Sequence, residues 1–185
     1  MIISEIASGG PGGYDDNFIE VANWGTEPVD VTGWELFRYT GAGSVASAPQ
    51  NTLQGTIGAG ERWVFAGESD QSTIADADVK QRYTTSLVNE SYGALLRDSS
   101  GEDVDAVAVQ FPDTANQACG EGTVLANTTD SAAGESFQRT QGTDGKAADF
   151  IRAPHPGRGE RHRAVAGTEA RRRARLRGRA HWRGR

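Results

Sequence analysis

The sequence contains a single cysteine, Cys119, so no disulfide forms within the chain, and the cysteine pair that crosses the core of antibody-type domains is excluded. Histidine is scarce as well, because the three histidines, His155, His162 and His181, all lie near the C-terminus. A catalytic thiol or serine needs an imidazole base, and a zinc site needs several His or Cys ligands. Residues 1–154 therefore cannot supply these centres, and we interpret Cys119 as a free or half-buried thiol in a loop.

Long hydrophobic runs are missing too. No apolar run approaches the roughly 20 residues that span a bilayer, so we expect no transmembrane segment. Met1 is followed at once by a strand candidate, which leaves no room for a secretory signal. We therefore expect a cytoplasmic protein or, if the recorded start lies inside a longer precursor, a secreted or cell-surface one.

Charge is distributed unevenly along the chain. Residues 152–185 contain 12 Arg and 2 Glu, a net charge of +10, which leaves 7 basic and 23 acidic residues, a net charge of −16, in residues 1–151. An acidic surface repels phosphates, so we do not expect this N-terminal part to bind nucleic acid. A glycosidase that uses two carboxylates stays formally open, but no pair stands out, and we predict that the chain is not an enzyme.

The clearest strand signals lie in residues 17–36. Ile19 and Val21 alternate with their neighbours at the period of a half-buried strand. Turn-forming residues 23–28 follow, and the next extended piece carries Trp34 and Leu36 two residues apart, on one side. We interpret this unit, with a buried Trp34, as the seed of a β-sandwich core.

The other apolar segments are short, and many of the 24 glycines fall between them, which is typical of an all-β protein. Strand candidates lie at residues 2–6, 53–57, 62–66, 93–97, 104–109 and 136–140, and one helical turn is expected within 70–79. The segments 93–97 and 104–109 form the clearest hairpin, with Asp105 and Val109 on the same face as Val107. Residues 110–130 lack periodicity and are expected to form a surface excursion. The predicted core residues are Ile19, Val21, Trp34, Leu36, Trp63, Phe65 and Val107.

Several of these pieces resemble, in the same order, the pattern of the lamin tail domain family, in particular its bacterial members. They are residues 2–6 (IISEI), 18–23 (FIEVAN), 27–36 (EPVDVTGWEL), 57–65 (IGAGERWVF), 93–98 (GALLRD) with 104–107 (VDAV), and 136–139 (SFQR). The resemblance covers about residues 1–158 and implies an immunoglobulin-like β-sandwich without a known catalytic centre. It also implies a non-catalytic interaction or anchoring module that binds an unidentified protein or cell-surface partner. We therefore divide the chain into a sandwich domain, residues 1–158, and a basic tail, residues 159–185.

The loop of the predicted hairpin carries oxygen-bearing side chains at Asp98, Ser100, Asp103 and Asp105. Calcium takes six to eight oxygen ligands, so these four residues are calcium candidates, although the spacing does not fit an EF-hand. A solvated hairpin loop is the alternative that we prefer, and no other cofactor is expected. Residues 15–17 form a second acidic cluster, which we interpret as a loop cap for the strand that follows.

The densest basic run lies in the tail and consists of Arg171, Arg172, Arg173, Arg175, Arg177 and Arg179. Such a run binds phosphate backbones by releasing counterions, so nucleic-acid binding through the tail, and only there, is the alternative function. Two further interpretations stay open. The tail docks electrostatically on the acidic domain, or it is a disordered segment that is not the natural continuation of the chain, since an alternative reading frame of G+C-rich coding sequence gives similar runs. The sequence leaves the oligomeric state open.

Overall fold

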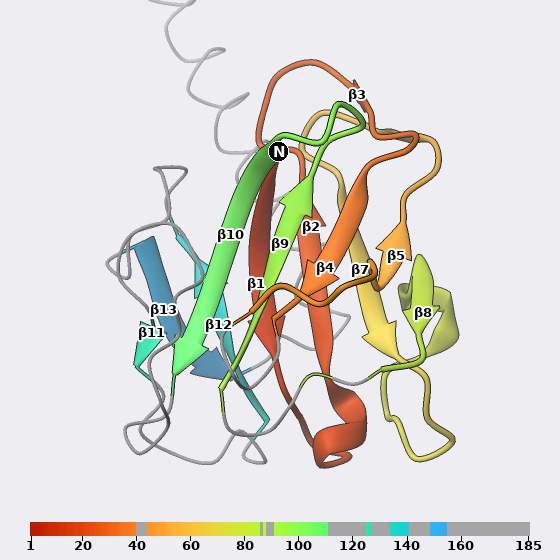
Figure 1. Ribbon diagram of the computed structural model, residues 1–185. Helices are drawn as coiled ribbons and strands as arrows, with labels where there is room; N and C mark the ends of the chain where they lie inside the picture. Colours follow the sequence, from red (N-terminus) through yellow and green to blue (C-terminus); the bar gives the residue numbers. More distant parts are fainter. Residues whose placement is uncertain are drawn as a thin grey trace, which may run out of the picture. The chain divides into compact units, whose positions relative to one another are not determined.

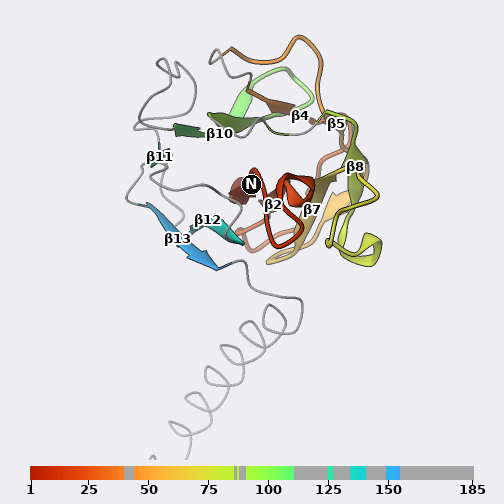
Figure 2. The ribbon, with the colours of Figure 1, turned by 90° about the horizontal axis from the view of Figure 1, so that it is seen from below.

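The computed structural model describes residues 1–39, 44–85, 87, 91–110, 125–126, 134–140 and 149–154. Within these residues two β-sheets lie face to face, which Figure 2 shows as two layers. The chain therefore has the predicted all-β, immunoglobulin-like sandwich. Cys119, the three histidines and the Arg-rich tail fall outside the described residues.

The larger sheet has the strand order β13-β12-β1-β2-β7-β8 and the smaller one the order β11-β10-β9-β4-β5 (Figure 1). The larger sheet comprises β13 (Phe150–Pro154), β12 (Glu135–Arg139), β1 (Ile2–Ala7), β2 (Phe18–Ala22), β7 (Arg62–Gly67) and β8 (Gln81–Tyr83). The smaller sheet comprises β11 (Leu125–Ala126), β10 (Asp103–Gln110), β9 (Tyr92–Arg97), β4 (Glu35–Arg38) and β5 (Asn51–Thr52). A two-stranded pair, β3 (Val29–Asp30) with β6 (Thr56–Ile57), and two 3-10 turns, η1 (Tyr14–Asp16) and η2 (Asp76–Asp78), complete the described elements.

Strand pairing within the two sheets is mostly antiparallel and follows the local sequence pattern. The predicted hairpin is confirmed, because β9 pairs antiparallel with β10. Its turn contains Gly101 at φ +90°, a backbone conformation that residues with a Cβ rarely adopt. Two pairings, β7 with β8 and β10 with β11, are parallel and lie at sheet edges.

The main core fills the space between the two sheets. Six of the seven predicted core residues are buried in it, namely Ile19, Val21, Leu36, Trp63, Phe65 and Val107. Trp34 differs from the expectation, because it precedes β4 and is only half-buried against this core. Asp105 and Val109 are buried on the face of β10 that Val107 shares, as the alternation predicts.

The expectation that β2 is half-buried is wrong, because all five of its residues are buried. β2 lies inside the six-stranded sheet, and its outer face is covered as well. There Phe18 packs with Ala7 and Ala66, and Ile74 and Val79 from the segment after β7 pack against them. A period-2 pattern reports which face a side chain takes, whereas the burial of that face depends on what the rest of the chain lays over it.

Three further expectations need adjustment. The helical turn within 70–79 is the single 3-10 turn η2. The strand expected at 53–57 is shorter, because β5 ends before it at Thr52 and β6 begins only at Thr56. A short strand, β11, lies within the stretch 110–130 that was expected to be irregular. Within the described residues no helix is long and apolar enough to span a membrane.

Candidate functional site

Asp105 lies between the two sheets rather than in the hairpin loop. Its Oδ2 accepts a hydrogen bond from the backbone N–H of Ile3 on β1 (2.6 Å), and Nη2 of Arg139 on β12 lies 2.9 Å from both carboxylate oxygens. The side chains of Arg139 and Asp105 are only 1% and 4% exposed, so this is a buried ion pair. Burial raises the pKa of Asp105, and the nearby Arg139 guanidinium opposes that rise.

The position of Asp105 completes the hydrogen bonding of β1. β12 pairs with β1 only at Glu5 and Ile6, so Ile3, nearer the start of the strand, receives no partner from β12. The carboxylate from the opposite sheet accepts that N–H instead. Asp105 therefore links β10 to β1 and β12, and both of its oxygens are engaged in the interior.

The other three calcium candidates also have partners within the protein. Asp98 Oδ1 accepts hydrogen bonds from the N–H and the hydroxyl of Ser100 (2.8 and 2.7 Å) and from the N–H of Glu102 (3.0 Å). These hydrogen bonds lower the pKa of Asp98, and the bond from the Ser100 hydroxyl contributes most. Asp103 pairs with Arg97 at 2.7 Å. Within the described residues no group of three or more His, Cys, Asp or Glu side chains is placed to hold a metal ion, and calcium binding by this loop stays a prediction.

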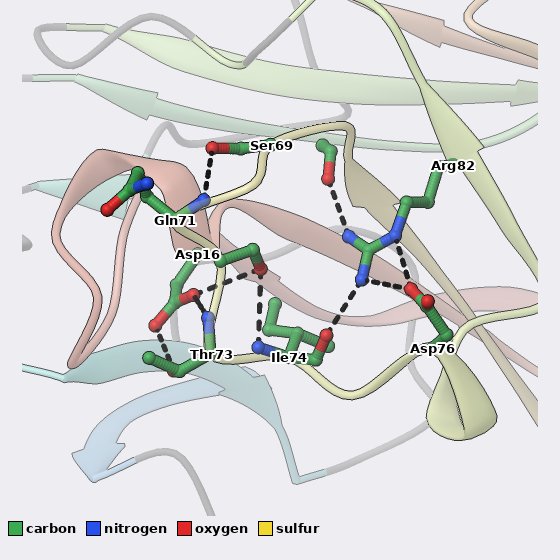
Figure 3. Close-up of polar contacts among 9 residues, drawn as sticks. Asp16, Ser69, Gln71, Thr73, Ile74, Asp76 and Arg82 are labelled. Atoms are coloured by element: carbon green, nitrogen blue, oxygen red, sulfur yellow. Dashed lines mark hydrogen bonds and ion pairs between the residues drawn. The ribbon is translucent and has the colours of Figure 1, made fainter.

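In the second acidic cluster, Asp16 holds a loop that is distant in sequence. Asp16 is buried, and its carboxylate accepts hydrogen bonds from the N–H and hydroxyl of Thr73 and the hydroxyl of Ser72 (Figure 3). It also accepts one from the N–H of Gly12. Burial alone raises the pKa of Asp16, but these hydrogen bonds together outweigh it and lower that pKa. A Cβ at position 12 would lie 2.8 Å from Asp16 Oδ2, so glycine is needed for the chain to wrap this carboxylate.

Arg82 on β8 closes the same loop from the other side. Its guanidinium donates to the carbonyls of Gly67 and Ile74 (both 2.7 Å) and to Asp76 Oδ1 (2.7 and 2.9 Å), as Figure 3 shows. Arg82 was not predicted as a site residue. No signal in the sequence marks it, because its partners lie 6 to 15 positions away, at the end of β7 and in the segment that follows it.

Two glutamates that the sequence did not single out lie opposite one another on the outer face of the larger sheet. Glu5 on β1 is paired in register with Glu20 on β2, and both are buried. Like charges directly opposite one another destabilise a sheet. Donors around the pair offset this repulsion, because Ser136 donates to Glu5 (2.6 Å) while Ser4 (2.8 Å) and Arg62 (3.3 Å) donate to Glu20.

Asn17 and Asn23, at the two ends of β2, are buried amides that hold loops. Asn17 Oδ1 accepts from the hydroxyl of Tyr83 (2.8 Å) and the N–H of Leu87 (3.2 Å). Burial raises the pKa of the Tyr83 phenol well above its ordinary value, so Tyr83 stays a donor. Asn23 Nδ2 donates to the carbonyls of Glu27 and Ile57, which closes the loop between β2 and β3.

The polar residues just described therefore mainly hold loops and strands in position. The clusters at Asp16 and at Asp98 lie at opposite ends of the sandwich (Figure 1), so they do not combine into one site. Acid–base or nucleophilic catalysis needs a side chain that is placed to exchange a proton with a bound substrate or to attack it. Here the carboxylates, amides and guanidinium groups just described bond to backbone and side chains that hold loops and sheets together.

Comparison with protein-family models matches residues 1–110 to the Lamin Tail Domain family. The match covers more than half of the chain and runs from β1 through β10. Arg139, the partner of Asp105, lies beyond the matched range. A search of curated proteins found no match.

Proposed function

Because the chain belongs to the lamin tail domain family, whose members are non-enzymatic immunoglobulin-like modules, we propose that it is an interaction or anchoring module for a protein or cell-surface partner. The observation that carries this proposal is the use of the buried polar groups. Asp16, Asn17, Asn23 and Asp105 each hold a loop or strand in a defined position. Loops held in this way lose little conformational freedom on binding, which favours recognition.

The test of a binding role uses the full chain with a photoreactive residue at Glu102, at one end of the sandwich, or at Asp70, at the other (Figure 1). Both positions are exposed. Cross-linking in an extract of the source cells, followed by purification of the captured protein, should yield a partner that binds the purified chain saturably in calorimetry. Failure to reconstitute binding from purified components would count against the proposal.

An enzyme assay tests the opposing hypothesis that the chain is a hydrolase. The full chain is incubated with ester, glycoside and phosphodiester substrates beside a Glu20→Gln variant, because Glu5 and Glu20 are a carboxylate pair that the fold brings together. We expect no turnover by either protein. Turnover by the native chain that the variant loses would replace the proposed binding role with a hydrolytic one.

Nucleic-acid binding through the tail is a second proposal, which rests on the density of Arg171, Arg172, Arg173, Arg175, Arg177 and Arg179. If these six side chains contact phosphates, the affinity for a DNA duplex should fall about a thousandfold between 50 and 200 mM salt. Fluorescence anisotropy measures this dependence, and the matched control is the full chain with all six arginines changed to glutamine. Binding that is equal for both proteins would refute it.

A further inference from the structure

Trp24 is an exposed tryptophan that the core does not explain. It lies in the loop between β2 and β3, and 38% of it is exposed. By contrast, Trp63 is buried in the core and Trp34 packs against it. Tryptophan is enriched among the residues that contribute most to binding at protein interfaces, so an exposed indole on an ordered loop is a candidate contact.

The loop that carries Trp24 is held rigidly by the residue before it. The Asn23 side chain donates to the carbonyls of Glu27 (2.8 Å) and Ile57 (3.0 Å) and accepts from the N–H of Gly25 (3.0 Å). The Asn23 backbone bonds to Glu61 and Gly60 in the turn before β7. Five hydrogen bonds at one residue thus fix the base of the loop, and the entropy of ordering it is already lost before a ligand binds.

The end of the sandwich that carries the β2–β3 loop is acidic. The loops at this end of the sandwich (Figure 1) carry exposed or half-buried carboxylates that form no ion pair within the described residues, namely Glu27, Asp30, Glu61, Asp98 and Glu102. Two of the cations at this end are already paired, Arg62 with Glu20 and Arg97 with Asp103, and the N-terminal ammonium also lies at this end (Figure 1). The carboxylates without an ion pair outnumber this ammonium, so the balance of charge at this end is negative, which favours a cationic ligand.

Elsewhere in this protein, cations lie over aromatic rings. The ammonium of Lys80 is 3.9 Å from the ring centre of Trp63, and the guanidinium of Arg97 is 5.0 Å from that of Phe37. No cation of the described residues lies over Trp24 in this way. An exposed indole at the same end of the sandwich as carboxylates without an ion pair has the chemistry that binds Lys or Arg side chains through the ring face and the charge together.

We propose that the Trp24 surface, defined as Trp24 with Glu27, Asp30, Glu61, Asp98 and Glu102, docks a basic, extended segment of a partner polypeptide. A Lys or Arg side chain lies on the indole, and its neighbours along the segment meet the carboxylates. A nucleic acid does not fit, because these carboxylates repel phosphates. This inference rests on the proposed binding role and specifies the class of partner.

The test measures the binding of a fluorescein-labelled peptide of alternating Gly and Arg to the full chain by anisotropy at 0.15 M salt, with a Gly–Gln peptide as the control probe. Trp24→Leu keeps apolar area but removes the aromatic face, and it should weaken binding about two- to fivefold. Glu27→Gln removes one charge in the loop that carries Trp24 and should weaken binding by a similar or smaller factor. Asp70→Asn removes the same charge at the other end of the sandwich and should leave binding unchanged.

Thermal melting confirms that each variant is folded, and Trp24→Phe, which retains a ring, should lie between Trp24→Leu and the native chain. The proposal is overturned if all variants bind the Arg peptide equally, since the attraction is then to net charge alone, or if the Gln peptide binds as well. A further variant changes six arginines of the tail to glutamine, namely Arg171, Arg172, Arg173, Arg175, Arg177 and Arg179. If this variant binds the Arg peptide more tightly than the native chain, a basic segment of the chain itself occupies the Trp24 surface, and the proposal of a separate partner is overturned. If the partner found by cross-linking binds the Trp24→Leu variant as tightly as the native chain, this inference is wrong, while the proposed binding role still stands.

Discussion

Replacement of Asp105 by Asn should destabilise the sandwich strongly. The substituted amide would keep an oxygen for the N–H of Ile3 but would remove the carboxylate charge that faces the Arg139 guanidinium, which is 1% exposed. Removal of one partner from a buried ion pair costs about 3–5 kcal/mol, because a charge stays buried without compensation. At about 2–4 °C per kcal/mol for a protein of this size, the melting temperature should fall by about 6–20 °C.

The matched control is Asp103→Asn, two residues earlier on the same strand. Asp103 is 54% exposed and pairs with a partly exposed Arg97, so this pair is screened by water. Its loss should cost only about 0.2–1 kcal/mol. Urea unfolding of the full chain measures both variants, with the midpoint shifting and the slope unchanged if only stability is altered.

A double variant, Asp105→Leu with Arg139→Met, separates the charge from the packing. Removing both charges avoids the buried unpaired ion, so the double variant should be more stable than Asp105→Asn. It still leaves the Ile3 N–H without an acceptor, which costs about 1–3 kcal/mol. If Asp105→Asn costs less than about 1 kcal/mol in urea, or if the double variant is the less stable of the two, the buried pair does not link the sheets as described.

Three further predictions concern the loops. Folding lowers the pKa of Asp16, so the stability that its carboxylate contributes is full above its ordinary pKa and is lost as the pH falls below about 4. Urea titrations between pH 2.5 and 6 should show that the free energy of unfolding falls less steeply with acid in Asp16→Asn than in the native chain. An equal dependence on pH in the two proteins would contradict this prediction. Arg82→Ala should free the loop between β7 and β8, which limited proteolysis detects as new cleavage within 68–80, whereas Arg97→Ala should leave that loop protected. Asn23→Ala removes three side-chain hydrogen bonds and should destabilise the fold by about 1–3 kcal/mol in thermal melts; a change below about 0.5 kcal/mol would show that the backbone bonds alone hold the loop.

The local pattern of the chain was enough to predict most of the architecture. Alternation at Ile19 and Val21 identified β2, and the hairpin of β9 and β10 follows from two apolar runs joined by a short polar loop. These features depend on neighbours within a few residues, which is why they can be recognised without a structure. The same holds for the shared face of Asp105, Val107 and Val109, which follows from the two-residue period of a strand.

Polar contacts could not be predicted wherever the two partners are distant in sequence. Asp98 and Asp105 belong to one hairpin, yet one closes its own turn while the other reaches Ile3, 102 positions away. Asp16 meets Thr73 across 57 positions, and Glu5 meets Ser136 across 131. A spacing of acidic residues cannot distinguish a cation ligand from the partner of a buried arginine, since both need the same carboxylate.

The sequence by itself determined most of the strands, the hairpin, the class of fold and the separation of acidic from basic charge, because these depend on composition and on short-range periodicity. Only the tertiary structure decided that β2 is buried on both faces, that Trp34 is half-buried while Trp24 is exposed, and that Asp105 lies against Arg139 between the sheets. The physical reason is that burial and ion pairing are set by which strands the fold places side by side, and the closest partners of these residues lie tens to more than a hundred positions away along the chain.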